Sequence, residues 1–191
     1  MKYVKRDSIL TYRMLDEYHL TISEAITLYS FFLIFPFYDS SSPKYRSLKD
    51  YGWEKETITN KLKKDLISVF NYDEFIEFVP CSSFEKIVNE RKLVVGNSHL
   101  HEQEKGIVER DKSKVHHFET ITRHIRNCLA HSNYRLIMNN HTKMVLLEDR
   151  TTGQLPVVNA RFILKLDTLL SWIRAIDKSS IVLNAFEIVK E

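Results

Sequence analysis

The clearest periodic pattern of apolar and polar positions lies between residues 115 and 134. Apolar residues recur there at steps of three and four, which places them on one side of an α-helix: Val115, Phe118, Ile121, Ile125 and Leu129. A polar set lies on another side of the same helix: His117, Thr120, His124, Asn127 and His131. The pattern breaks at Asn133. The sequence therefore predicts a helix that ends at or just beyond His131, with an apolar face and a face of imidazoles and amides.

Helical periodicity also dominates the rest of the chain. Further helices are predicted over residues 7–18, 21–35, 54–69, 83–93 and 159–176. In the second of these, Thr21 and Glu24 have the spacing of a capping box. Residues 72–79 are compatible with either a helix or a strand, and residues 134–138 and 144–147 flank a good turn sequence, which predicts a β-hairpin.

These elements predict a mainly α fold. The chain contains only 4 Gly and 4 Pro, which favours helices over a sandwich or barrel. Its 191 residues fit a single domain, 1–191. We expect residues 1–106 to form an N-terminal helical part, and residues 107–191 to hold the motif helix, the hairpin and a C-terminal helix.

Composition indicates the cellular compartment of the protein more clearly than its chemical activity. The net charge of +3 permits nucleic-acid binding without arguing for it. Cys81 and Cys128 show neither metal-ligand spacing nor a disulfide framework, so a reducing cytoplasm is expected. The basic N-terminus is not followed by an apolar signal core, and the apolar run 31–38 is shorter than the ~20 residues of a membrane span.

The pair Arg126 and His131 suits cleavage of a phosphodiester without a metal. Histidine titrates near pH 6.5, so it can take a proton from a ribose 2′-hydroxyl or donate one to the leaving oxygen. Arginine stays charged and binds phosphate oxygens in a forked geometry. Asn127, one turn before His131, is suited to orient that histidine. The structural alternative is that both side chains simply interact with the helix dipole, which is worth about 0.3–1 kcal/mol.

The motif Arg126-Asn127-x-x-Ala130-His131 resembles the signature of HEPN domains, in which an arginine and a polar residue precede a histidine by a few positions. The resemblance covers roughly residues 107–176. It implies a HEPN-like helical bundle with a small β-hairpin after the motif helix. It also implies a metal-independent, cofactor-free endoribonuclease that yields a cyclic phosphate, with Arg126, Asn127 and His131 as catalytic residues.

The same resemblance implies partners. HEPN ribonucleases are dimers with a composite cleft, and Arg126 and His131 lie roughly 140° apart around one helix. We therefore expect a homodimer whose interface includes Asn127, Ala130 and His131. RNA is the expected substrate, and the predicted setting is a toxin or an anti-phage defence effector, with no membrane association.

Four further residues are predicted to contact the substrate or support the cleft: Glu119, Arg123, His124 and Tyr134. Glu119 can pair with Arg123 or orient Arg126, and the alternative is an ordinary surface ion pair. In some HEPN toxins, a nucleotidyltransferase antitoxin modifies a tyrosine two positions after the histidine. Tyr134 instead comes three positions after His131, so it matches that pattern imperfectly. A nucleotidyltransferase-type antitoxin, or another defence-system partner, is what the resemblance implies, and the structural alternative is that Tyr134 simply opens the hairpin.

Other functions stay open at this stage. One alternative is a non-catalytic HEPN module that binds RNA, a nucleotide or a protein partner through the same cleft. Another is an N-terminal half that senses a phage component and holds a ribonuclease inactive. A zinc site at His99, His101 and His116 or His117 is conceivable, but histidines in a polar loop are more often solvated. No metal is therefore expected.

Overall fold

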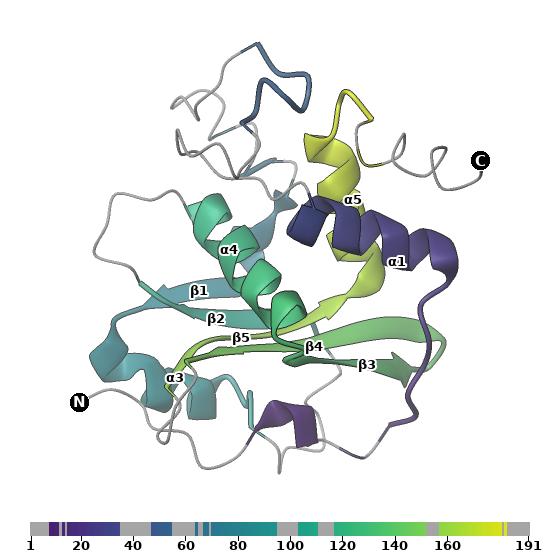
Figure 1. Cartoon of the computed structure of the whole chain (residues 1–191). Coiled ribbons are helices and arrows are strands. Elements are labelled where there is room, and N and C mark those ends of the chain that lie inside the picture. The colour runs from purple at the N-terminus through teal and green to yellow at the C-terminus, as the bar shows by residue number, and fades with distance from the viewer. Residues whose placement is uncertain are drawn as a thin grey trace.

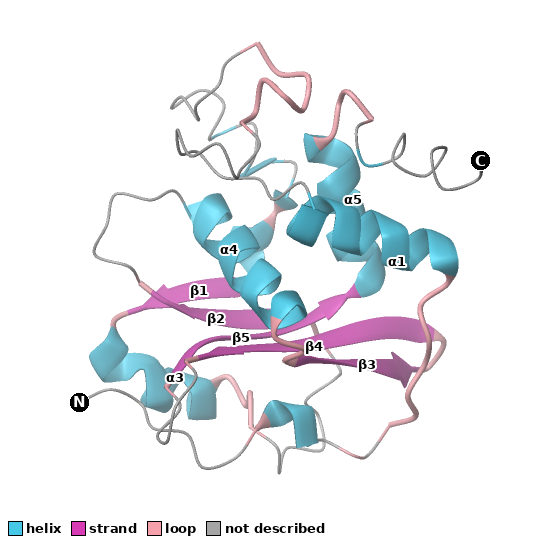
Figure 2. Cartoon of the chain, in the orientation of Figure 1, coloured by secondary structure: helices cyan, strands magenta, loops and turns pink. Residues whose placement is uncertain are grey.

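The computed structural model describes residues 8–11, 13, 15–34, 47–54, 64, 67–68, 70–94, 103–110, 117–151, 157–180 and 182. Within them the chain forms one five-stranded mixed sheet with helices on both faces (Figures 1 and 2). Its strands are β1 (Ile76–Val79), β2 (Lys105–Glu109), β3 (Tyr134–Asn139), β4 (Thr142–Arg150) and β5 (Val158–Lys165). Their order across the sheet is β1-β2-β5-β4-β3. β1 and β2 are parallel, and the other neighbours are antiparallel.

The helices divide between the two faces of this sheet. Above it in Figure 1 lie α1 (Ile22–Tyr29), with its π-helical continuation η2 (Ser30–Ile34), α4 (His117–Ala130) and α5 (Leu166–Ile176). Below it lie α3 (Phe84–Glu90) and the 3-10 turn η1 (Ile9–Thr11). Two further 3-10 turns flank β1, namely η3 (Tyr72–Glu74) and η4 (Cys81–Ser83).

Each face of the sheet carries its own hydrophobic cluster. Along β4, Val145 and Leu147 belong to the cluster under α1, α4 and α5, whereas Met144 and Leu146 belong to the cluster over α3. This alternation is the period of two that a strand imposes on its side chains. β4 and β5 are therefore central strands that are buried on both faces.

The prediction of a mainly α, HEPN-like helical bundle is wrong, because the centre of the protein is this sheet. The largest error lies in the predicted helix 159–176, whose first half is β5 and whose second half is α5. A strand that is buried on both faces is apolar nearly throughout, so periodicity cannot distinguish it from a buried helix. β1 also lies within residues 1–106, the part expected to be helical.

Other local predictions have mixed outcomes. Thr21 and Glu24 form both hydrogen bonds of the capping box at the start of α1, which confirms that prediction. The hairpin of β3 and β4 is confirmed as well. The predicted helix 7–18 is wrong: the described residues of this range form only the short turn η1, and Glu17 instead bridges to Ile137 at the edge of the sheet.

Two further predictions concern the helix 54–69 and a membrane-spanning segment. Most of the predicted helix 54–69 lies outside the described residues. Among the residues that are described, no helix is both long enough and apolar enough to cross a lipid bilayer.

Candidate functional site

A crevice opens where the two parallel strands end. After β1 the chain passes to α3 on one face of the sheet, and the helix that follows β2, α4, lies on the opposite face (Figure 1). When neighbouring parallel strands are followed by helices on opposite faces, a gap remains beyond their carboxyl ends, and ligands commonly bind there. A pocket of about 670 Å³ lies at this position. Its lining residues are Pro80, Cys81, Glu109, Arg110, Arg123, His124, Asn127 and Asn159.

His124 is the buried ionisable group of this pocket. It is only 6% exposed, and its Nδ1 lies 2.5 Å from Oδ2 of Asp149, a β4 residue that is itself buried. A carboxylate at Nδ1 favours the tautomer that carries its hydrogen on that nitrogen, which leaves a lone pair on Nε2. That Nε2 is buried and has no hydrogen-bond partner among the described residues. A histidine held in this way can accept a proton at Nε2 where that atom meets a donor.

Asn127 joins Arg126 to the same carboxylate. Its Nδ2 donates to Oδ2 of Asp149 at 3.2 Å, and its Oδ1 accepts from a terminal nitrogen of Arg126 at 3.3 Å. Arg126, Asn127, Asp149 and His124 thus form one connected network. Buried Cys128 lies beside it: burial raises the pKa of its thiol well above the ordinary value, and the negative charge of Asp149 adds to the effect.

His131 is the C-cap of α4 and is exposed. The next two residues close the helix, since the N–H of Ser132 donates to the carbonyl of Leu129 and that of Asn133 to the carbonyl of Cys128. This is the Schellman pattern, with Ser132 at φ +53° in the position that usually holds glycine. His131 contacts Asn127 through the backbone, by donating its N–H to the Asn127 carbonyl at 3.0 Å. The side chain of Asn127 binds Asp149 instead of orienting His131.

The remaining predicted site residues lie in α4 and at the start of β3. Arg123 lines the pocket beside His124. Glu119 is buried, two turns before Arg126 on the same side of the helix. Tyr134 opens β3, where its hydroxyl lies 2.6 Å from that of Tyr29, and it is not among the residues that line the pocket.

Of the four histidines suggested as zinc ligands, the structure describes only His117, which is also the first histidine of the polar side of α4. His117 stacks on Phe78 of β1, with ring centroids 4.0 Å apart. His99, His101 and His116 lie outside the described residues. The contact between His117 and Phe78 joins the start of α4 to β1.

The sequence pattern does not single out Asp149, Arg110 or Asn159 as residues of the site. Asn159 is simply the first residue of the range predicted as the helix 159–176. One feature of the sequence could have indicated Asp149: the pair Glu148-Asp149 directly follows the apolar run 144–147. If the strand formed by that run continued through the pair, its two carboxylates would point to opposite faces of the sheet, and at least one would be buried. β4 in fact continues through Arg150 and buries both acids, one on each face of the sheet.

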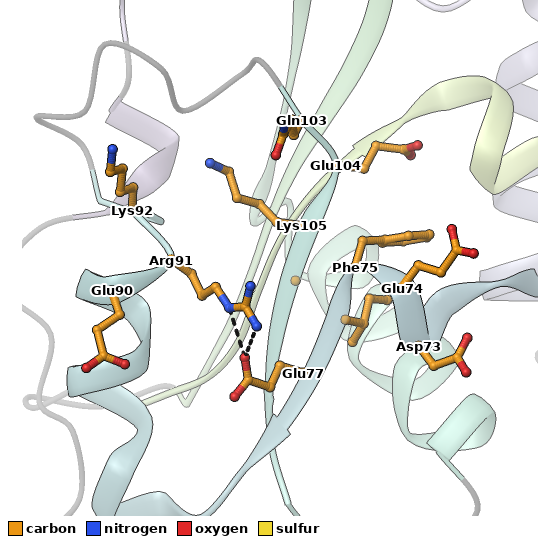
Figure 3. A pocket seen from close by; sticks show the side chains of 12 residues that line it. Asp73, Glu74, Phe75, Glu77, Glu90, Arg91, Lys92, Gln103, Glu104 and Lys105 are labelled. Carbon is orange, nitrogen blue, oxygen red and sulfur yellow. Dashed lines mark hydrogen bonds and ion pairs between the residues drawn. The ribbon is translucent and has the colours of Figure 1, made fainter.

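A second pocket, of about 580 Å³, lies at the opposite ends of β1 and β2. Arg91 enters it and donates two hydrogen bonds, of 2.9 and 2.7 Å, to one carboxylate oxygen of Glu77 (Figure 3). Carboxylates of Asp73 and Glu74 lie on the other wall (Figure 3). Acidic and basic groups thus share this pocket, and none of the described residues that line it is a histidine.

Comparison with known proteins adds nothing to these observations, because no family model, no curated protein and no solved structure matches the chain. The HEPN resemblance therefore stays a prediction that depends on the motif alone.

Proposed function

We propose that this protein is a metal-independent endoribonuclease. The observation that supports the proposal is the network in which buried Asp149 holds His124 and, through Asn127, Arg126. This network adjoins a pocket lined by two arginines, Arg110 and Arg123. Together the groups supply a proton acceptor and fixed positive charge, which is what cleavage of a phosphodiester needs.

In the proposed reaction, Nε2 of His124 accepts the proton of a ribose 2′-hydroxyl. The 2′-oxygen attacks the adjacent phosphorus, the bond from phosphorus to the 5′-oxygen breaks, and a 2′,3′-cyclic phosphate remains. The leaving oxygen takes a proton from His131 and departs as a free hydroxyl. Asp149 stabilises the imidazolium that forms on His124, and Arg123 and Arg126 stabilise the growing charge on the phosphate oxygens. Because the nucleophile is the 2′-hydroxyl, the substrate is RNA.

The proposal extends to the biological setting. Unrestrained RNA cleavage harms the cell, so the enzyme acts in the cytoplasm as a toxin or as an anti-phage defence effector. A nucleotidyltransferase-type antitoxin or another defence partner restrains it. The proposed active form is a homodimer. Exposed His131, with Ala130 and Asn127 beside it, makes a small surface at the end of α4 that suits a two-fold contact.

A second candidate function is a module that binds RNA or a nucleotide without cleaving it. The observation that favours it is the burial of the His124 Nε2 atom, together with the two hydrogen bonds that one Asp149 oxygen forms with His124 and Asn127. Such a network also suits a purely structural role, in which a buried polar cluster fixes α4 on the sheet.

The test compares the wild type with His124→Gln and His131→Gln on end-labelled RNA in EDTA, and on the same strand with 2′-deoxyribose. His19→Gln is the matched control, because His19 is exposed and lies outside the network. We expect cyclic-phosphate ends from RNA alone, about 10²–10⁴-fold slower cleavage by His124→Gln, and wild-type cleavage by the control. A slower His131→Gln variant with normal folding would support the acid role of His131.

Two results would reject the nuclease. Cleavage of the deoxy strand would exclude attack by the 2′-hydroxyl. RNA binding without cleavage by folded wild-type protein, at every concentration that permits dimerisation, would favour the binding module.

A further inference from the structure

We infer that the crevice pocket beyond β1 and β2 binds a single nucleotide unit, with its phosphate on Arg110 and Arg123. The inference rests on the proposed function, because RNA is the polymer that would supply this nucleotide. It adds a binding site within one chain, separate from any cleft between two copies. The pocket's volume of about 670 Å³ lies within the roughly 300–1,000 Å³ typical of small-molecule sites.

The two arginines approach the pocket from different elements. Arg110 directly follows β2; its backbone N–H donates to the carbonyl of Val79 at 2.7 Å, and one terminal nitrogen donates to the carbonyl of Phe78 at 3.3 Å. These bonds hold Arg110 against the end of β1. Arg123 comes from α4. A guanidinium offers five donors in a planar fork, so two of them converging on one pocket suit the oxygens of a phosphate.

The other lining groups suit a sugar and a base. Asn127 and Asn159 each carry an amide donor and an amide acceptor, and Glu109 adds a carboxylate acceptor for ribose hydroxyls or base amines. Pro80 offers an apolar surface at the end of β1. Glu109 also opposes a second phosphate, because its negative charge offsets one of the two arginines. The expected ligand is therefore a monophosphate unit rather than a di- or triphosphate.

A buried polar group gives independent support for a ligand in this pocket. His124 is more than nine-tenths buried, lines the pocket, and has a ring nitrogen without a hydrogen-bond partner among the described residues. Asn127 lines the same pocket while it binds Asp149. A nucleotide in the crevice would therefore adjoin the network that holds His124, and its phosphate on Arg123 would be the group placed beside that histidine.

Cys81 provides a direct reporter of occupancy. It is partly exposed and lines the pocket, whereas Cys128 is fully buried. The experiment measures the rate at which iodoacetamide alkylates Cys81 in the full-length protein, in the presence of nucleoside 3′-monophosphates of the four bases. Nucleosides and inorganic phosphate are the comparison probes, and mass spectrometry identifies the alkylated residue.

We expect saturating nucleotide to slow alkylation of Cys81 several-fold. Arg110→Gln and Arg123→Gln should each weaken the apparent Kd for the nucleotide about tenfold or more, because each removes a charged hydrogen-bond donor to phosphate. Arg91→Gln is the matched control. Arg91 lies at the opposite ends of β1 and β2 and pairs with Glu77 (Figure 3), so its loss should leave the Kd unchanged. Circular dichroism verifies the fold of each variant.

Each contrary outcome has a definite meaning. Equal protection by inorganic phosphate alone would show an anion site and overturn the nucleotide assignment. Absence of both protection and calorimetric binding, with RNA cleavage intact, would overturn this inference and leave the proposed nuclease standing. Protection by nucleotides in a protein that cleaves no RNA would do the reverse: the pocket would stand and the nuclease would fall.

Discussion

Breaking the ion pair between Glu148 and Arg161 should cost far more stability than breaking an ion pair on the protein surface. The two residues are cross-strand partners in β4 and β5, and they are 0% and 1% exposed. Nε of Arg161 donates to Oε2 of Glu148 at 3.0 Å, and another nitrogen of the guanidinium donates to the carbonyl of Leu93 at 2.9 Å. Glu148 also accepts from the hydroxyl of Ser8 at 2.9 Å and from the backbone N–H of Ile9 at 3.3 Å. The pair thus joins the central strands to η1 and to the segment after α3.

The proposed change is Glu148→Gln, which keeps the size of the side chain and removes its charge. Arg161 then keeps its charge in the core but loses the carboxylate of Glu148, and breaking a buried ion pair in this way costs about 3–5 kcal/mol. For a protein of this size, each kcal/mol lowers Tm by about 2–4 °C, so Tm should fall by about 6–20 °C. The double replacement of Glu148 by Leu and Arg161 by Met should recover only part of this loss. Apolar side chains need no counter-ion, but the N–H of Ile9 and the carbonyl of Leu93 lose these hydrogen bonds.

Urea unfolding followed by tryptophan fluorescence measures the effect, since Trp172 is buried in the core of the other face. Glu77→Gln is the matched control. Its partner Arg91 is a surface residue, and the side chains of Arg91 and Glu77 are 61% and 37% exposed, so that pair should contribute less than about 1 kcal/mol. If Glu148→Gln lost no more stability than Glu77→Gln, the reasoning from burial would be refuted.

Three further predictions follow from the same core. Gly106→Ala should lower the free energy of unfolding by about 1–3 kcal/mol in a denaturant titration, because the new methyl group would lie 2.6 Å from the ring of buried Phe162; an unchanged midpoint would contradict this. A thiol reagent should modify only Cys81 in the native protein and both cysteines in urea, because Cys128 is buried and burial raises the pKa of its thiol. Modification of Cys128 in the native protein would contradict the packing of α4. Burial raises the pKa of Tyr29 to about 12 from its usual 10. The neutral phenol therefore contributes stability that is complete below about pH 10 and is lost as the pH rises through about 12. When the ultraviolet titrations of the wild type and Tyr29→Phe are compared, the variant should lack one phenol that ionises near pH 12. If the missing phenol ionised near pH 10 instead, the burial argument would be wrong.

The positions of several elements follow from local sequence. The capping box at Thr21 and Glu24, the amphipathic stripe of α4 and the turn between β3 and β4 depend on residues a few positions apart. Local hydrogen bonds and periodicity suffice to specify such elements. The motif on α4 is found in the same way. Arg123, His124 and Asn127 line one pocket, whereas Arg126 and His131 are not among the residues that line it.

The sheet and the completed site depend on pairing between distant parts of the chain. β5 has the apolar pattern of a buried helix, and it becomes a strand because β2 and β4 bind its two edges. Asp149 lies 25 residues from His124, and Glu148 lies 139 residues from Ile9. A strand turns neighbouring residues to opposite faces, so Glu148 stabilises the core below the sheet while Asp149 holds the histidine above it. Local periodicity therefore specifies which helix carries the motif. Which histidine of that helix obtains a carboxylate is determined by the tertiary fold, because it depends on where β4 lies beneath α4.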